Sequence, residues 1–341
     1  MPNSTPDATG SGVALIRGEM QRQHGDALAS MDTAADMAKK IAASIARTGR
    51  LALIGMGGSH CMNRTAEALY RAEGIDTLAI TASEQLYQPI PGLETWTRIF
   101  TSQSGGSAEI VRLLDGKGAD DTFGLTLNAE SELAQTIPCL VGVGGPETAY
   151  AATRSLLVTL ALHAAILEAL GASQGDVLAL LKSPLMPDVS SALPPLADVS
   201  SIIFSARSCL VGVTEAGALG LLELARMPGF AIEGGQFRHG PIEALNPDIG
   251  VVLVRADDAS AKLSVGLAEI CLSAGVTPVV FDASGLPDMP GCVTIPLQQS
   301  SGLAAVIAAL PPLQSLLLAL AETRVENVGV PIRAQKITDT E

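Results

Sequence analysis

Aromatic residues are scarce in this chain of 341 residues: Phe, Trp and Tyr together make up 3% of it, although hydrophobic residues of all kinds reach 48%. A core with so few rings has to be built from Ala, Leu, Val and Ile. Charged residues are also few, at 16%. This balance is typical of a globular protein and excludes a disordered one. The length predicts about two domains.

Basic charge is the second shortage. The chain has 21 Lys and Arg against 35 Asp and Glu, which gives a net charge of −14. Because a polyanion would be repelled, we expect no nucleic acid partner. An anionic small substrate would have to be held by hydrogen-bond donors at its binding site, since the negative net charge of the protein does not attract it.

Paired cysteines, targeting signals and long apolar runs are missing as well. The five dispersed cysteines show no CxxC or CxxH spacing, which indicates reduced thiols in a cytoplasmic protein. Residues 1–12 lack the basic and apolar regions of a signal peptide and are expected to form a frayed tail. The apolar run at 155–172 is interrupted by His163 and Glu168, whereas spanning a bilayer takes roughly 20 apolar residues. We therefore expect a buried helix there, and no membrane partner.

Short apolar runs alternate with helical patterns along the chain. Strands are expected at 50–55, 76–83, 97–102, 122–128 and 138–144, then again at 201–205, 250–256, 277–284 and 292–297. Helices are expected at 14–46, 63–74, 107–118, 149–170, 211–227 and 301–322. This alternation predicts parallel sheets covered by helices on both faces. The predicted organisation is an N-terminal tail and helix (1–34), a first α/β domain (35–182), a Pro- and Ser-rich linker (183–200), a second α/β domain (201–325) and a C-terminal tail (326–341).

Two polar loops follow predicted strands. GMGGSH (55–60) lets the backbone approach a ligand, although by itself it fits an ordinary strand–helix turn equally well. SQSGGS (102–107) offers three hydroxyls, an amide and two glycines at the start of a helix, where unpaired N–H groups suit a phosphate. The alternative is simple helix capping by Ser104 or Ser107. Because both loops lie at the carboxyl ends of strands, we favour a phosphate site. The second domain has VRADDASAKLS in place of the serine loop, so we expect one such site per chain.

Three ionisable residues could carry chemistry. Glu223 is the only charged residue in the helical stretch 216–225, and loss of hydration would raise its pKa and make it a proton carrier near neutrality. His239 lies in a glycine-flanked loop, from which a side chain can reach a site. Each also has an ordinary surface interpretation, and Lys336, near the C-terminus, would normally be solvated.

The motifs GMGGS, TSQSGGSAE and LLELARMPGFAIEGGQFRHGPIEAL resemble the double sugar-isomerase (SIS) domain of the isomerase half of glucosamine-6-phosphate synthase and its stand-alone relatives. The resemblance covers nearly the whole chain. It implies two tandem α/β domains, each a flavodoxin-like three-layer unit, and a homodimer. It also implies a small sugar phosphate as the substrate, and no metal or cofactor, because the proton moves without net redox change.

The resemblance also implies roles for particular residues. Phosphate-binding positions are matched by Gly57, Gly58, Ser59, Ser102, Gln103, Ser104 and Ser107. Glu223 matches the glutamate that moves a proton between C1 and C2. His239 matches the histidine that opens the sugar ring from the neighbouring subunit. Lys336 matches a lysine near the sugar carbonyl, in a tail that closes over the active site.

Two departures from the family pattern shape the expected activity. The glutamine-hydrolysing domain of the synthase has no counterpart in the sequence, and Gly220 replaces a lysine found three residues before the glutamate. We therefore expect a glucosamine-6-phosphate deaminase that gives fructose 6-phosphate and ammonia. A fructosamine-6-phosphate deglycase and a non-catalytic phosphosugar sensor remain open alternatives.

Overall fold

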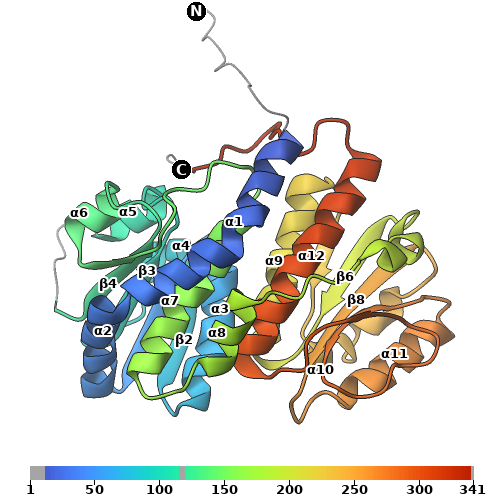
Figure 1. The fold of residues 1–341 in the computed structure, drawn as a ribbon, viewed down its shortest axis with the longest axis horizontal. Coiled ribbons are helices and arrows are strands. Elements are labelled where there is room, and N and C mark those ends of the chain that lie inside the picture. Colours follow the sequence, from blue (N-terminus) through green and yellow to red (C-terminus); the bar gives the residue numbers. More distant parts are fainter. Residues whose placement is uncertain (1–11, 115–119, 339–341) are drawn as a thin grey trace, which may run out of the picture.

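The computed structural model describes residues 12–114 and 120–338. Almost all of the expected N-terminal tail, and the end of the helix expected at 107–118, lie outside these residues. Within them the chain forms two parallel five-stranded sheets that lie side by side, each flanked by helices (Figure 1). The α/β prediction is confirmed, whereas the flavodoxin-like layering and the limits of the two domains stay predictions.

The first sheet has the strand order β2-β1-β3-β4-β5. Its strands are β1 (Arg50–Gly55), β2 (Asp76–Thr81), β3 (Thr97–Thr101), β4 (Thr122–Thr126) and β5 (Cys139–Val141). β1 pairs in parallel with β2 and β3, so that Gly55 lies opposite both Thr81 and Thr101. The loops that follow β1 and β3 therefore emerge next to each other, at one edge of the sheet.

The second sheet has the order β10-β9-β8-β6-β7. Its strands are β6 (Ser201–Ser205), β7 (Gly229–Ala231), β8 (Ile249–Ala256), β9 (Val279–Ala283) and β10 (Val293–Pro296). The sequence analysis missed β7, which has three residues and therefore too little length for a detectable alternation of apolar and polar side chains.

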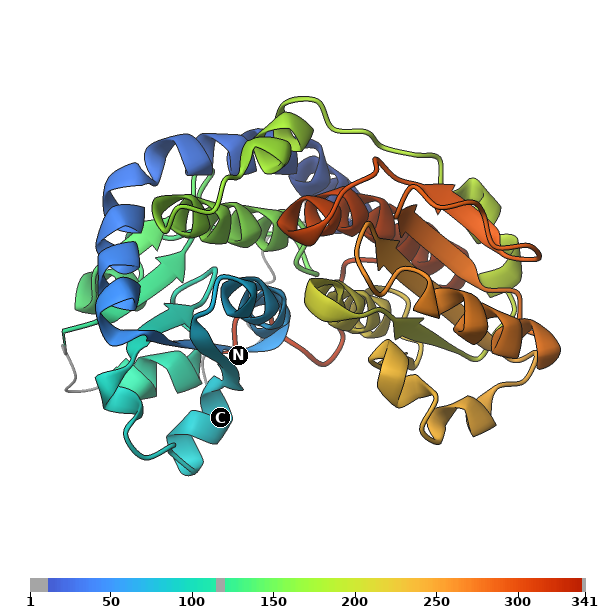
Figure 2. The ribbon, with the colours of Figure 1, turned by 90° about the horizontal axis from the view of Figure 1, so that it is seen from below.

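Helices cover the sheets and fill the space between them. The first half of the chain has α1 (Gly12–Thr33), α2 (Ala35–Thr48), α3 (Gly57–Ala72), α4 (Ala82–Tyr87), α5 (Ala108–Leu114), α6 (Glu132–Thr136), α7 (Arg154–Ala169) and α8 (Gly175–Lys182). The second half has α9 (Val211–Leu224), α10 (Gly234–Phe237), α11 (Leu263–Ser273) and α12 (Gly302–Arg324). Figure 2 shows α3, α7, α9 and α12 between the two sheets, where α3 contacts α9 and α12 contacts both α7 and α9.

Some expected boundaries were wrong. The single helix expected at 14–46 is divided at Ala34, and the helix expected at 63–74 begins six residues earlier, at Gly57. Most of GMGGSH is thus the first turn of α3, not a loop. The Pro-rich linker contains two 3₁₀ turns, Ser190–Ala192 and Pro194–Leu196.

The apolar residues form one large core that joins the two sheets, and two smaller clusters. All five cysteines are free thiols, as expected, and three of them are buried. Among the described residues, α12 alone has the length and apolar composition to cross a membrane, and 89% of its most apolar window is buried inside the protein. The helix expected at 155–172 corresponds to α7 and is buried almost throughout.

Candidate active site

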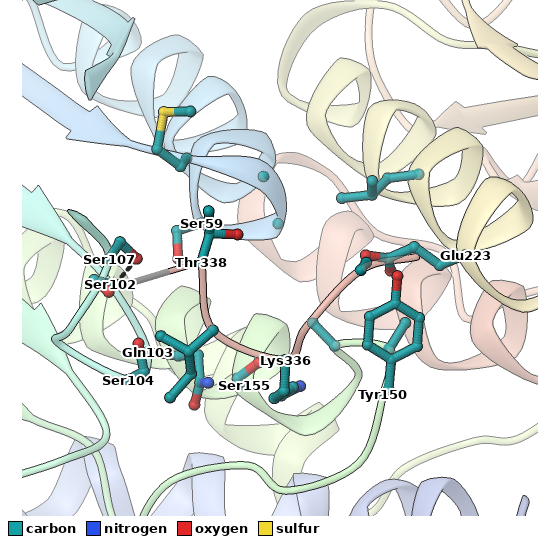
Figure 3. A pocket seen from close by; sticks show the side chains of 18 of the residues that line it. Ser59, Ser102, Gln103, Ser104, Ser107, Tyr150, Ser155, Glu223, Lys336 and Thr338 are labelled. Carbon is teal, nitrogen blue, oxygen red and sulfur yellow. Dashed lines mark hydrogen bonds between the residues drawn. The ribbon is translucent and has the colours of Figure 1, made fainter. Parts of the chain in front are cut away.

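A cavity of about 300 Å³ lies between the two sheets, at the carboxyl ends of β1 and β3. Figure 3 shows that side chains from both halves of the chain point into it. Its lining includes all of the predicted site residues except His239: Gly57, Gly58, Ser59, Ser102, Gln103, Ser104, Ser107, Glu223 and Lys336. Ser59 and Lys336 are more than 270 residues apart in the sequence, yet both line this cavity.

The loop after β3 forms a cup of hydroxyl groups at one end of the cavity. Ser102 and Ser107 lie with their Oγ atoms 3.1 Å apart, and Ser104 is buried beside them. Gly105 has a φ of +66°. A Cβ atom there would lie 2.1 Å from the Oγ of Ser131, so that no other residue fits.

The amides of this cup are not bare, contrary to the expectation from sequence. The Gly105 amide donates to Ser102 Oγ at 3.1 Å, and the Gly106 amide donates to Ser104 Oγ at 3.3 Å. The serines therefore both cap the turn and line the cavity, which combines the two interpretations that the sequence left open. Free amides come instead from the first turn of α3, because the first N–H groups of a helix have no intrahelical acceptor.

The turn that begins α3 depends on its two glycines. Gly57 has a φ of +50°, and a Cβ on Gly58 would lie 2.8 Å from the Cδ2 atom of Leu156 in α7. This close approach brings Ser59 to the cup. The start of a 16-residue helix carries positive partial charge and therefore favours an anion.

Glu223 lies at the other end of the cavity, on α9 (Figure 3). Burial raises the pKa of its carboxyl group from 4.5 to about 7; the nearby Lys336 opposes this rise, and Glu147 adds to it. A carboxyl group with a pKa close to the ambient pH can both accept and return a proton.

Glu147 is a buried acid that the sequence analysis missed. The residue is 2% exposed, and its carboxylate accepts hydrogen bonds from the amides of Thr153 and Arg154, both at 2.8 Å, and from the hydroxyls of Thr153 and Ser155. The Nζ atom of Lys336 lies 3.5 Å from the same carboxylate. Glu147 therefore satisfies the start of α7 and holds Lys336 in the cavity.

The Glu147 backbone also reaches the cup, since its amide donates to Gln103 Oε1 at 3.1 Å. One residue thus joins the serine loop, the start of α7 and the C-terminal lysine. In the sequence, Glu147 is a single acidic residue in the stretch GGPETAY. This stretch has no helical or strand pattern, so nothing in it marks Glu147 as part of a site.

The C-terminal segment runs through the site. Residues 334–338 line the cavity, and the carbonyl of Thr338 accepts a hydrogen bond of 3.1 Å from the amide of Ala108 at the start of α5. Residues 334–338 thus form part of the cavity wall, and 339–341 lie outside the described residues. Closure of a C-terminal tail over the active site stays a prediction.

Further residues in the lining were not predicted. Tyr150 and Ser155 are among the polar ones, and Figure 3 shows the Tyr150 ring pointing toward Glu223. Burial raises the pKa of Tyr150, and the Glu223 carboxylate adds to this rise. A lone tyrosine in an irregular segment gives no sequence signal of such a position.

His239 is exposed, follows α10, and does not line the cavity. His163, interpreted as a core histidine, is fully buried in α7, and its Nδ1 atom lies 3.2 Å from the hydroxyl of Tyr70. Among residues 12–114 and 120–338, no three His, Cys, Asp or Glu side chains form a group that could hold a metal ion.

Comparison with known sequences finds isomerizing aminotransferases among the relatives of this chain. The human glutamine–fructose-6-phosphate aminotransferase (isomerizing) 2 is 26% identical over 321 residues, which are 87% of this chain and 47% of that protein. The aminotransferase of the same name from Agrobacterium fabrum is 23% identical over 278 residues, 74% of this chain and 44% of that protein. The chain therefore spans about half the length of the curated relatives it matches. No family model matches it.

Comparison with solved structures gives the same fold. The C-terminal domain of the glucosamine–fructose-6-phosphate aminotransferase from Francisella tularensis superposes with a TM-score of 0.79 at 18% identity, covering 96% of this chain and all of that one. A glucosamine-6-phosphate deaminase from Thermotoga maritima has a TM-score of 0.77 at 22% identity and covers 95% and 99% of the two chains. The chain is thus related in sequence to the isomerizing aminotransferases and has the fold of their C-terminal domain.

Proposed function

We propose that this protein moves a proton between C1 and C2 of an amino-sugar phosphate and releases the amine. The favoured substrate is glucosamine 6-phosphate, with fructose 6-phosphate and ammonia as products. The relatives described above are named for fructose 6-phosphate or glucosamine 6-phosphate. Over half of each of the two curated relatives described above lies outside the match, so the activity is argued from the site of this chain alone.

In the proposed reaction the serine cup and the start of α3 hold the 6-phosphate. This anchor places the other end of the open-chain sugar toward Glu223. Glu223 removes the proton from C2, which gives an enaminol, and returns it to C1, which leaves an imine at C2. Water then adds to the imine carbon and ammonia leaves, so that all atoms balance without any oxidation. Lys336 lies beside the carbonyl end, where a cation would stabilise negative charge that develops on oxygen.

One observation carries this proposal. A half-buried carboxyl group with a pKa of about 7 and a cup of four serine hydroxyls, from Ser59, Ser102, Ser104 and Ser107, line opposite ends of one cavity. A surface glutamate would have neither the raised pKa nor the shared cavity. General acid–base catalysis by such a group typically contributes about 10²–10⁴-fold to the rate.

The test is ammonia release from glucosamine 6-phosphate by the wild type and by Glu223→Gln. We expect the variant to lose at least about 100-fold in kcat. Glu269→Gln, the same change on the exposed face of α11, is the matched control and should keep full activity. Equal rates for wild type and Glu223→Gln would contradict the proposed role.

Two alternatives remain. A fructosamine-6-phosphate deglycase would use the same residues on a substrate with a larger amine, and assaying the two substrates side by side distinguishes it from the deaminase. A non-catalytic sensor would bind sugar phosphates equally well with and without Glu223 and turn over none of them. His239 is proposed to act in the cavity of a neighbouring subunit of a homodimer, and its exposed position is compatible with that role. A cytoplasmic location is likewise proposed.

A further inference from the structure

A small cavity of about 20 Å³ lies at the carboxyl ends of β6 and β8, in the second sheet. Its place matches that of the serine cup in the first sheet, which lies at the ends of β1 and β3. The two sheets have the same order, β2-β1-β3 in one and β7-β6-β8 in the other. In each, the chain crosses from one side of the first strand to the other at this point, and open parallel sheets bind ligands at such crossings.

The cavity lies between the second sheet and α11. Successive side chains of a strand point to opposite faces of a sheet. Ile203 and Leu253 point to the face that packs on Leu267 of α11, in one apolar cluster. Ser205 and Arg255 are each two residues further along the same strands, so their side chains point to this face as well. Both of them line the cavity.

Two buried donors in the lining have no acceptor. Ser205 Oγ and Arg255 Nε are without a hydrogen-bond partner among the described residues, and the two residues are 2% and 4% exposed. The Nη2 atom of the same arginine donates to the carboxylate of Asp282 and to the carbonyl of Pro287. An unpaired buried donor costs free energy. A ligand with an acceptor atom between Ser205 and Arg255 removes this cost for both groups at once.

The charges around the cavity favour an anionic acceptor. Arg207 and Arg255 line it, and none of the described residues in its lining is acidic. Arg207 pairs with Glu233 at 3.1 Å, but a guanidinium group has five N–H donors and can bind a second acceptor. The first turn of α11, which includes Ser264 of the lining, adds N–H groups without an intrahelical acceptor and a positive partial charge.

We propose that this cavity is a second anion site of the chain and that it binds a phosphate group. One water-sized group needs about 10–15 Å³ of comparable volume, so the cavity admits one oxygen atom and excludes a sugar ring. That oxygen accepts hydrogen bonds from Ser205 and Arg255. The other oxygens of the phosphate lie at the mouth, beside Arg207, whose side chain is 25% exposed.

The expectation of one phosphate site per chain rested on the segment VRADDASAKLS, which lacks the serine loop. This segment nevertheless supplies Arg255 and the start of α11. Its own serines are engaged, since the hydroxyls of Ser260 and Ser264 donate to Asp258 Oδ1 and to the carbonyl of Ala261. The second half of the chain thus holds a phosphate mainly with guanidinium groups, where the first half uses hydroxyls. The inference goes beyond the proposed function and does not depend on it.

Titration with inorganic phosphate in a calorimeter should show two sites per chain. Ser205→Ala should weaken one of them at least about tenfold, the effect typical of losing a hydrogen bond to a charged group. Because this hydroxyl has no partner among the described residues, the change should not lower the free energy of unfolding measured without phosphate. Ser201→Ala, the same change at the amino end of β6, is the matched control and should bind phosphate as the wild type does.

Two further variants identify the site. Arg255→Lys keeps a positive charge near Asp282 and removes the Nε–H group, so it should weaken the same site as Ser205→Ala. Ser102→Ala should weaken only the other site, in the serine cup. Methyl phosphate distinguishes the sources of the group: binding as tight as that of inorganic phosphate indicates the phosphate end of a larger ligand, and weaker binding indicates the free ion.

Failure of this inference can be told from failure of the proposed function. A single phosphate site per chain in the wild type, or equal affinities in Ser205→Ala and Ser201→Ala, overturns the inference and leaves deamination of glucosamine 6-phosphate intact. Displacement of the second phosphate by an equal concentration of chloride shows a site for any anion, and overturns the inference as well.

Discussion

Replacement of Glu223 by glutamine is expected to destroy activity and yet stabilise the fold at high pH. Burial raises the pKa of this carboxyl group from 4.5 to about 7. This rise in pKa corresponds to a free energy of up to about 3 kcal/mol between the two protonation states. That energy measures how strongly the cavity disfavours the ionised form relative to the unfolded chain.

The sign follows from the direction of the shift. Below pH 4.5 the group is protonated in both the folded and the unfolded state, and it costs no stability. As the pH rises toward 7 it ionises in the unfolded chain first, which draws the equilibrium toward unfolding, and above 7 the cost is complete. A glutamine stays neutral at every pH, so the variant avoids this cost. Its advantage over the wild type should grow by about 2–3 kcal/mol between pH 5 and pH 8.

Urea unfolding of both proteins at pH 5 and pH 8 measures this difference. Other titrating groups are common to both proteins, so their contributions cancel in the comparison. Glu269→Gln, on an exposed helix face, controls for the substitution itself and should show no such pH-dependent gain. A Glu223→Gln variant whose advantage is the same at both pH values would refute the idea that burial perturbs Glu223, and with it the proton-transfer role.

Four further outcomes follow from the same site. Lys336→Met should raise the pKa of Glu223, because the lysine opposes the rise, and so move the acidic limb of the kcat/KM profile to higher pH. Glu147→Gln should cost at least about 2 kcal/mol in urea unfolding, since the amide cannot accept all the hydrogen bonds of the carboxylate. Ser102→Ala should raise KM for glucosamine 6-phosphate with little change in kcat, and an unchanged KM would argue against the cup. Mixing inactive His239→Ala and Glu223→Gln subunits should restore part of the activity if the histidine serves its neighbour.

The repeated strands were predictable because each follows a physical pattern that needs no tertiary information. Buried parallel strands are short apolar runs that end at glycine or polar residues, as β1 does at Gly55. Helix starts were harder to place, since α3 begins with two glycines that propensity assigns to a loop. There the close approach of Gly58 to Leu156 decides the conformation, and that contact joins residues almost 100 positions apart.

The sequence predicts those site residues that belong to a recognisable motif or stand out by composition. The serine loop and Glu223 stand out by composition, and the cavity lining contains both. Lys336 looks like a solvated terminal lysine in the sequence, and only Glu147 and the path of the C-terminal segment explain its place. Tyr150 has no local signal at all, because it lies in an irregular stretch and its place in the cavity depends on tertiary packing.

The distance between the serine cup and Glu223 depends on how closely α3 packs against α9, and Gly212 sets that contact. A Cβ atom on Gly212 would lie 2.2 Å from the carbonyl oxygen of Cys61 and 2.3 Å from the hydroxyl of Thr65, which itself donates to a backbone carbonyl of the second half of the chain. Gly212→Ala must therefore push the helices apart, at a cost of about 1–3 kcal/mol. Because α3 begins in the cup and α9 carries Glu223, kcat should fall more than thermal stability alone explains. Gly25→Ala, in α1 with open space around it, should leave kcat unchanged. A Gly212→Ala protein that is destabilised but retains its kcat would show that the spacing of the two helices does not govern catalysis.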